Sequence, residues 1–374
     1  MSTEHVHADR EPFVRMVKRD GISTKKAWLI RGIAIVGALI VCALLIFFVT
    51  KLNPLKVYTS MFKGALGTKT RIWITLRDTM MLLCISIGLA PAFKMRFWNI
   101  GAEGQVLVGG VATAACMIYL GGKVPTVVLF LIMIAASVLA GAVWGLIPAL
   151  FKAKWNTNET LFTLMMNYVA IQITSYCVSL WENPYGSNSV GIIHPTTEWG
   201  WFPKIFGQKY MLNIILVMAL TVAMYIYLKY SKQGYEISVV GESENTARYA
   251  GINVKKVILR TMIISSGICG LSGFIAVSGS SHTISVNTAG GRGFTAIIVA
   301  WLSKFNAIVM VLFSFLLVFL DKGAVEIASK YGLNEYASEI IEGIILFFIL
   351  GSEFFINYRL IFRGSDKKAK KGAN

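Results

Sequence analysis

Long apolar runs recur along this sequence of 374 residues and limit its fold more than any other feature. Each run is roughly 18–22 residues long, which is the length that an α-helix needs to cross the hydrocarbon core of a bilayer. Hydrophobic residues make up 55% of the chain and charged residues only 15%, and no stretch is polar for long enough to form a soluble domain of ordinary size. The sequence therefore predicts an all-α, polytopic membrane protein.

Hydropathy windows place about ten transmembrane helices along the chain. The spans fall near residues 30–49, 79–95, 103–121, 125–148, 160–181, 211–229, 257–279, 293–303, 306–322 and 338–356. The eighth span is too short to cross a bilayer alone, and it begins within the glycine-rich stretch GGRGF. We therefore expect a broken or re-entrant helix at that point.

The distribution of lysine and arginine predicts the orientation. The formal net charge is +17, and the basic residues cluster between and beyond the apolar runs, as the positive-inside rule and attraction to anionic lipids require. Both ends of the chain are basic, which places them in the cytoplasm, and an even number of spans such as ten is consistent with that. We expect a cytoplasmic N-terminal tail over 1–27, a transmembrane domain over 28–358 and a basic cytoplasmic tail over 359–374, with an external loop near 182–210 and a cytoplasmic loop near 229–256.

Residues 50–78 do not fit this topology. The segment holds six basic residues but would lie on the outer side. We expect it to form an amphipathic helix in the membrane interface, with its lysine side chains reaching toward water.

The sequence holds no pattern for catalysis, metal binding or nucleic-acid binding. The five cysteines are scattered through apolar segments without metal-ligand spacing. The nearest approach to a phosphate-binding loop is GALGTKT at 64–70, which lacks the Gly-Lys-Ser/Thr ending. We therefore expect no enzyme activity, no metal and no cofactor in this chain, and we expect its basic charge to contact lipid rather than nucleic acid.

A polar stretch, FWNIGAEGQ at 97–105, lies between two of the apolar runs. Polar side chains at membrane depth are costly because lipid offers them no hydrogen-bond partner. Asn99 and Glu103 are four residues apart and would share one face of a helix, and Gln105 follows them. These residues predict a pathway for a polar solute, or a helix break at which they satisfy one another and the freed backbone.

The predicted cytoplasmic loop contains small residues at helical spacing. Residues 241–254 read GESENTARYAGINV, and the small or apolar positions are Ser243, Ala247, Ala250, Gly251 and Val254. A stripe of this kind on a short helix permits close docking of a partner protein. The alternative is a connector that packs against its own chain.

Three glycines in the seventh span are spaced three apart, at Gly267, Gly270 and Gly273. They predict a face for tight helix packing. The GLSG of 270–273 also resembles a serine motif of intramembrane proteases. However, His282 lies about 15 Å further along the same span, too far for a serine–histidine pair.

Four segments together resemble one permease family. They are FWNIGAEGQ, NETLFTLMMNY at 158–168, GRGFTAIIVAWL at 291–302 and the 241–254 loop. In order and spacing they are similar to the permease subunits of nucleoside-type ABC importers of the basic membrane protein family, within the wider group of sugar, branched-chain amino acid and nucleoside permeases. The resemblance runs from about residue 30 to 360, and Trp98 departs from the family's pattern, which has a small or apolar residue there.

The resemblance implies a type II importer-like permease in a bacterial inner membrane, with a second, different permease subunit, a cytoplasmic ATPase that binds ATP and Mg²⁺, and an extracytoplasmic binding (lipo)protein. It implies a translocation path or gate at Asn99, Glu103, Gln105, Asn167 and Phe294, where Phe294 could stack on a nucleobase or simply pack. It implies ATPase coupling through a cytoplasmic coupling helix that carries Glu242, Asn245, Ala247, Arg248 and Gly251.

Two alternatives remain open at this point. An ion-coupled secondary transporter could use Glu103 or Glu159 to carry a proton, although the small-residue loop would then have no task. Within the permease group, a sugar or a branched-chain amino acid could replace the nucleoside as substrate.

Overall fold

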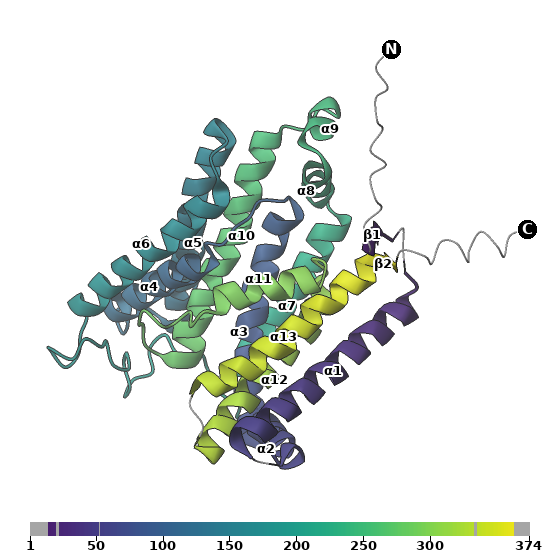
Figure 1. Ribbon diagram of the computed structural model, residues 1–374. Coiled ribbons are helices and arrows are strands. Elements are labelled where there is room, and N and C mark those ends of the chain that lie inside the picture. The colour runs from purple at the N-terminus through teal and green to yellow at the C-terminus, as the bar shows by residue number, and fades with distance from the viewer. Residues whose placement is uncertain (1–13, 20–21, 52, 333–334, 363–374) are drawn as a thin grey trace, which may run out of the picture. The chain divides into compact units, whose positions relative to one another are not determined.

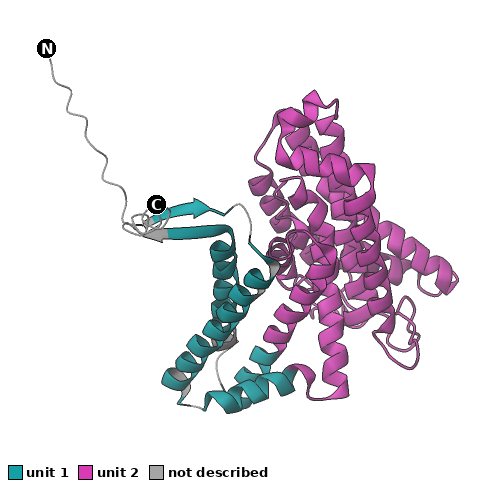
Figure 2. Cartoon of the chain, turned by 90° about the vertical axis from the view of Figure 1, so that its right-hand side faces the viewer, with its two compact units in different colours: residues 1–64, 323–374 teal, residues 65–322 magenta. Residues whose placement is uncertain are grey.

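The computed structural model describes residues 14–19, 22–51, 53–332 and 335–362. The chain divides into two compact units, which Figure 2 shows in different colours. One unit combines residues 1–64 with 323–374, and the other holds residues 65–322. Each unit has its own packing, and the residues of the candidate pathway lie in the second.

Among the described residues, eight helices are long and apolar enough to cross a membrane. They are α1 (Thr24–Thr50), α3 (Lys69–Lys94), α4 (Ala102–Leu120), α5 (Thr126–Trp155), α6 (Glu159–Leu180), α7 (Met211–Tyr230), α10 (Val254–Ala276) with its π-helical extension η1 (Val277–Ser281), and α12 (Ala307–Tyr331) (Figure 1). Two shorter apolar helices are α11 (Arg292–Leu302) and residues 343–357 of α13 (Glu335–Asn357). Every predicted span coincides with a helix, and α11 confirms the short eighth one. The all-α, polytopic class is therefore confirmed.

Residues 50–78 form an amphipathic helix only in part, and the location of that helix in the membrane interface stays a prediction. Residues 54–66 form the separate short helix α2 (Pro54–Leu66), and residues 69–78 are the first turns of α3. The side chain of Thr68 begins the second helix, because its Oγ1 accepts a hydrogen bond from the Arg71 backbone N–H at 3.2 Å.

Glycines allow α10 to pack closely against α4 and α5 in the second unit. A Cβ atom added at Gly270 would lie 2.3 Å from the Ser137 carbonyl oxygen, and one added at Gly273 would lie 2.2 Å from that of Val106. The predicted packing face is therefore confirmed. The hydroxyl of Ser272, in the protease-like GLSG stretch, donates to the Ile268 carbonyl at 3.2 Å, as a serine within a helix commonly does.

The first unit packs α1 against α13 and pairs two short strands. Strand β1 (Val14–Lys18) runs antiparallel to β2 (Tyr358–Phe362), with Met16 opposite Leu360. Arg31 of α1 forms an ion pair with Glu353 of α13. Strand β1 lies within the predicted N-terminal tail, and α1 begins at Thr24, inside the same tail. Strand β2 begins at Tyr358, one residue before the predicted C-terminal tail. The remainder of both tails, 1–13, 20–21 and 363–374, lies outside the described residues.

Candidate functional site

The polar stretch 97–105 forms the break between α3 and α4. The carboxamides of Asn99 and Gln105 face each other, with Nδ2–Oε1 and Nε2–Oδ1 distances of 3.3 and 3.2 Å. Asn99 Oδ1 also accepts a hydrogen bond from the Gly101 N–H at 3.1 Å. The prediction that Asn99 and Glu103 share a helix face is wrong, because Asn99 precedes the start of α4 at Ala102. The two carboxamides instead close the turn between the helices.

Helix α6 holds this break from the side. Asn167 accepts a hydrogen bond from the Gly104 N–H at 2.8 Å through Oδ1 and donates one to the Ile100 carbonyl at 3.0 Å through Nδ2. Thr163 Oγ1 accepts from the Ile100 N–H at 3.1 Å. A Cβ atom at Gly104 would lie 2.9 Å from Asn167 Oδ1, so a side chain there would separate the two helices. Sequence reasoning selected Asn167 but not Thr163.

Glu103 connects the break to the short helix α11. Its two carboxylate oxygens accept hydrogen bonds from the backbone N–H groups of Gly291 at 2.7 Å and Gly293 at 2.8 Å. The first N–H groups of a helix have no partner within the helix, and the helix dipole favours a negative charge beside them. Glu103 is only 8% exposed and therefore acts as a buried cap for α11.

Aromatic rings surround the same break. The indole of Trp98 stacks on that of Trp301 in α11, with centroids 5.3 Å apart and planes 27° apart, and Phe93 contacts both rings edge-on. This stacking gives a structural reason for a large residue at position 98. Phe294 lies on α11 with 45% of its surface exposed, so its predicted contact with a solute stays a prediction.

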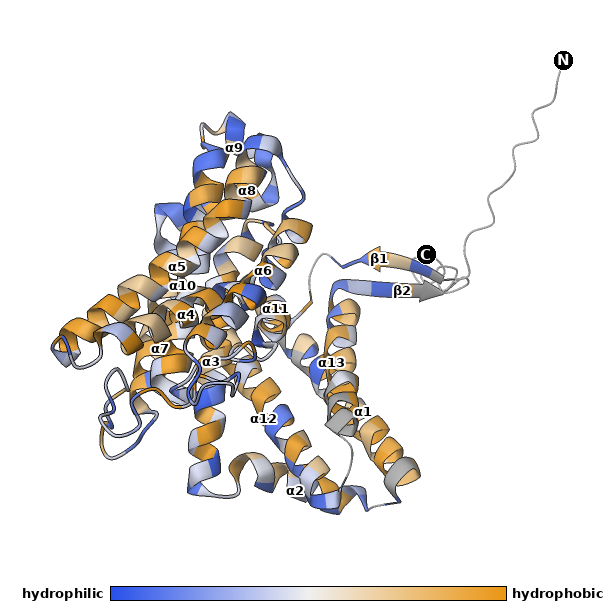
Figure 3. Ribbon diagram, turned by 90° about the vertical axis from the view of Figure 1, so that its left-hand side faces the viewer, coloured by the Kyte–Doolittle hydropathy of each residue, from blue (hydrophilic) through white to orange (hydrophobic). Residues whose placement is uncertain are grey.

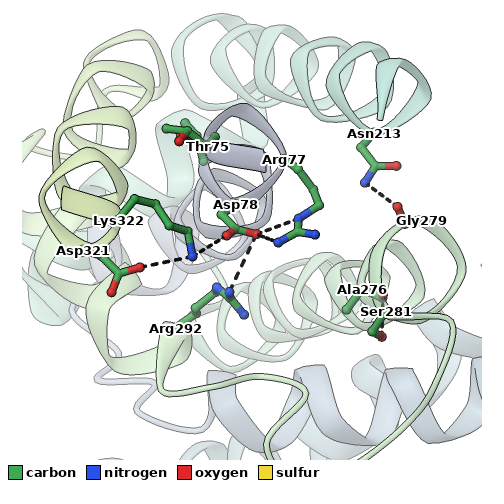
Figure 4. A network of polar contacts seen from close by, with 11 residues as sticks. Thr75, Arg77, Asp78, Asn213, Ala276, Gly279, Ser281, Arg292, Asp321 and Lys322 are labelled. Carbon is green, nitrogen blue, oxygen red and sulfur yellow. Dashed lines mark hydrogen bonds and ion pairs between the residues drawn. The ribbon is translucent and has the colours of Figure 1, made fainter. Parts of the chain in front are cut away.

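A buried cluster of charges, which sequence reasoning missed, centres on Asp78 of α3. This residue is 4% exposed. Its Oδ1 accepts a hydrogen bond from Arg77 Nε at 2.8 Å, and its Oδ2 lies 2.8 Å from Lys322 Nζ of α12. Arg292, the first residue of α11, approaches Asp78 Oδ1 to 3.8 Å (Figure 4). The hydropathy windows started the second span at residue 79, so Asp78 fell at the end of the segment predicted to lie in the membrane interface. An acidic residue directly before an apolar run was the available signal.

A cavity of about 270 Å³ lies beside the charge cluster. Its lining is dominated by charged, hydroxyl and carboxamide side chains: Arg77, Asp78, Met81, Asn213, Ile275, Ala276, Ser280, Ser281, Thr283, Ser285, Asn287, Thr288 and Arg292. These residues come from α3, the start of α7, the end of α10 with η1, the segment that leads into α11, and the first residue of α11. The cavity therefore brings hydrogen-bonding side chains from several helices of the second unit to one place.

The loop after α6 packs against the end of α10 near this cavity. The rings of Trp201 and His282 stack with centroids 3.8 Å apart, and Trp201 Nε1 donates to the Ile193 carbonyl at 2.8 Å. Burial lowers the pKa of His282, and the nearby Lys209 lowers it further. The imidazole of His282 thus stacks on Trp201, while the Ser272 hydroxyl donates to the Ile268 carbonyl of its own helix.

The segment predicted as a coupling helix is not one continuous helix. Helix α8 (Lys232–Glu242) ends at Glu242, and α9 (Glu244–Tyr249) begins after Ser243, whose side chain accepts from the Thr246 N–H at 3.2 Å. Gly251 then adopts a φ of +75°, which ends the helical path before α10. An extended, capping Ser243 explains why the helical spacing of the small residues did not produce a single helix.

The small-residue stripe is partly used inside the protein. Ala247 is fully buried and Val254 is 6% exposed, which favours the packing alternative for those two positions. The opposite side of α9 is open: Glu242, Asn245, Arg248 and Gly251 are exposed, and Tyr249 is 94% exposed. Figure 3 shows hydrophilic residues concentrated on α9, at one end of the apolar helices of this unit. Sequence reasoning did not select Tyr249.

Comparison with known proteins decides the family. The family described as branched-chain amino acid transport system / permease component matches residues 71–350. The chain belongs to this permease family. Residues 71–350 include the break at 97–105, the α8–α9 segment, the charge cluster and α11.

Three similar proteins cover most of this permease. It is 30% identical over 334 residues to the guanosine ABC transporter permease protein NupP of Bacillus subtilis. The matched region covers 88% of this chain and 93% of NupP. It is 28% identical over 367 residues to the glucose ABC transporter permease protein TsgB13 of Haloferax volcanii, covering 92% and 95%. It is 25% identical over 334 residues to the nucleoside ABC transporter permease protein NupB of Lactococcus lactis, covering 86% and 91%. With its apolar helices, the permease is a multi-pass membrane protein.

Proposed function

We propose that this permease is one membrane subunit of an ABC importer that carries nucleosides. The observation that carries the proposal is the similarity to NupP, a guanosine permease by name, over nearly the full length of both chains. NupB, named for nucleosides, supports the same class. TsgB13 and the family description keep glucose and branched-chain amino acids as the competing substrates.

We infer a positioning role for the polar residues of the break. The carboxamides of Asn99 and Gln105 bond to each other, and that of Asn167 bonds to the backbone. The carboxylate of Glu103 caps α11. We infer that they hold α11 in place at the pathway, rather than contacting the solute. This arrangement provides hydrogen-bond partners for the backbone N–H and C=O groups of the non-helical break, which lipid cannot provide.

The proposal includes partners and an orientation. A second permease subunit completes the pathway, an extracytoplasmic binding protein delivers the solute, and an ATPase holding ATP and Mg²⁺ docks at the α8–α9 end. No cofactor is assigned to this chain. The α8–α9 end and both termini face the cytoplasm of a bacterial cell, because lysine and arginine residues concentrate there.

The ion-coupled alternative lacks a free proton carrier among the two carboxylates first considered for it. Glu103 accepts two backbone hydrogen bonds, and Glu159 Oε2 lies 2.9 Å from Lys152 Nζ. Each carboxylate is therefore already engaged by a partner within the protein. This supports a transport cycle that is driven from outside the chain.

Tyr249→Asp should abolish stimulation of the partner ATPase. Tyr249 is almost fully exposed on α9, and a charged group there would replace an aromatic contact surface without disturbing the packing of α9 on its own protein. The measurement is ATP hydrolysis by the reconstituted four-component transporter, with and without nucleoside-loaded binding protein.

The matched control is Tyr185→Asp. Tyr185 is 95% exposed in the loop between α6 and α7, outside the α8–α9 segment. We expect this variant to keep wild-type hydrolysis, and both variants to elute as intact protein on size exclusion. Full ATPase stimulation in the Tyr249 variant would remove α9 from the docking surface.

A further inference from the structure

Among the three basic side chains of the charge cluster, Arg292 lies farthest from the Asp78 carboxylate. Its guanidinium lies 3.8 Å from Asp78 Oδ1, whereas Arg77 and Lys322 reach the same carboxylate at 2.8 Å. In the described part of the chain, Arg292 makes no side-chain hydrogen bond, and its side chain is 31% exposed. Its five N–H donors are therefore available to a ligand.

The cluster also carries an excess of positive charge. Arg77, Arg292 and Lys322 contribute three positive charges, while Asp78 and Asp321 contribute two negative ones. One positive charge is left unmatched. Lys322 does not line the cavity, and Arg77 is held by Asp78 and lies over the Tyr210 ring at 5.2 Å. The unmatched charge is therefore presented to the cavity by Arg292, which Figure 4 shows below Asp78.

The remainder of the cavity is suited to hydroxyl groups. Its serine, threonine and asparagine side chains can each donate and accept hydrogen bonds, which a sugar hydroxyl also does. Met81 and Ile275 add a small apolar surface. The volume of about 270 Å³ lies just below the usual range for ligand pockets, so the cavity holds one small solute.

We propose that this cavity binds one nucleoside, and that Arg292 selects its base. The inference rests on the proposed function. An arginine fork donates two parallel hydrogen bonds to an edge with two acceptors, such as O6 and N7 of guanine. Adenine presents one acceptor and one donor at that edge and cannot accept both bonds. The substrate class is therefore the 6-oxopurine nucleosides, with ribose against the hydroxyl-bearing side chains.

The position of the cavity makes it a solute-binding site near the extracytoplasmic end of the pathway. Asn213 lines the cavity at the beginning of α7, and Tyr230 ends that helix beside α8. The seventeen residue steps from Asn213 to Tyr230 span about 26 Å at 1.5 Å per residue. The cavity thus lies at the opposite end of the helices from α9, which is the side where a binding protein would release its solute.

Arg292→Gln should lower the preference for guanosine over adenosine by about tenfold. The measurement is uptake of both nucleosides by the four-component transporter in proteoliposomes, with the same binding protein throughout, so that its own selectivity cancels between variants. Arg292→Lys keeps the charge but loses the fork, and it should show most of the same loss.

Lys322→Gln is the matched control. Lys322 also contacts Asp78 but lies outside the cavity lining, so this variant should unfold earlier while keeping the wild-type preference for guanosine. An equal change in base preference for Lys322→Gln and Arg292→Gln would overturn the assignment, because both would then act only through Asp78.

A second experiment tests occupancy directly. Ser280→Cys, in a protein whose five native cysteines are replaced by alanine, places a thiol in the cavity lining. Guanosine should slow its reaction with a maleimide more than adenosine does, while Ser187→Cys in the exposed loop should react equally with and without nucleoside. Protection by inorganic phosphate instead of guanosine would overturn the nucleoside assignment and indicate an anion site. If uptake is driven by ATP but no nucleoside protects the thiol from the maleimide, the cavity is not the binding site, although the importer function stands.

Discussion

Replacing Gly270 by alanine is expected to prevent stable expression of the permease. The added Cβ atom would lie 2.3 Å from the Ser137 carbonyl oxygen and 3.0 Å from Gly141 Cα, and both are backbone atoms that cannot rotate away. Overpacking a core costs about 1–3 kcal/mol, and a clash with backbone lies at the top of that range or above it. Thermal unfolding of detergent-solubilised protein, followed by fluorescence size exclusion, measures the effect.

The control substitution is Gly343→Ala on α13. A Cβ atom there would meet no other atom within 4 Å. Alanine favours a helix over glycine by about 1 kcal/mol, so this variant should be as stable as wild type or slightly more so. Equal unfolding temperatures for the two variants would show that α10 does not pack as closely as the structure has it.

Glu103→Ala should lower the unfolding temperature and abolish transport together. The substitution leaves the buried N–H group of Gly293 without an acceptor, at a cost of about 1–3 kcal/mol, and also removes the acceptor of the more exposed Gly291 N–H. Glu103→Gln keeps one acceptor but turns an amide NH₂ toward the other N–H, so it should be destabilised less than the alanine variant. Unfolding temperature and nucleoside flux are measured on the same preparations.

The relation between these two readouts separates a positioning role from a direct one. If Glu103 positions α11, flux should fall in the same order as stability, with alanine below glutamine. Wild-type unfolding temperatures combined with lost flux in both variants would contradict the capping role. Glu103 would then contact the solute or move with the gate.

Hydropathy predicted the helices because each span must satisfy its own backbone in lipid, which forces a long, locally readable pattern. The same reasoning found the break at 97–105, since a polar stretch inside apolar sequence is also local. The hydrogen-bond partners of its polar side chains could not be predicted from the sequence. Glu103 bonds to Gly291 and Gly293, which lie 188 and 190 positions away, and Asn99 turns to Gln105 because the backbone leaves the helix first.

Asp78 and α9 show two further limits. Asp78 was missed because a window average places the span boundary at residue 79, and only the fold brings Arg292 and Lys322 to its carboxylate. At α9 the helical spacing of small residues was real, but a single capping side chain at Ser243 divided the segment. Helix capping by single side chains and contacts between distant residues thus determine features that hydrophobic periodicity does not predict.

The most direct test of the central claim is uptake of radiolabelled guanosine into proteoliposomes that contain this permease with its second permease subunit, ATPase and binding protein. We predict that uptake requires ATP and Mg²⁺, persists when the proton gradient is collapsed, and is competed by unlabelled nucleosides but not by glucose or leucine. Guanosine uptake by this chain alone, driven by a pH gradient without ATP, would contradict the account.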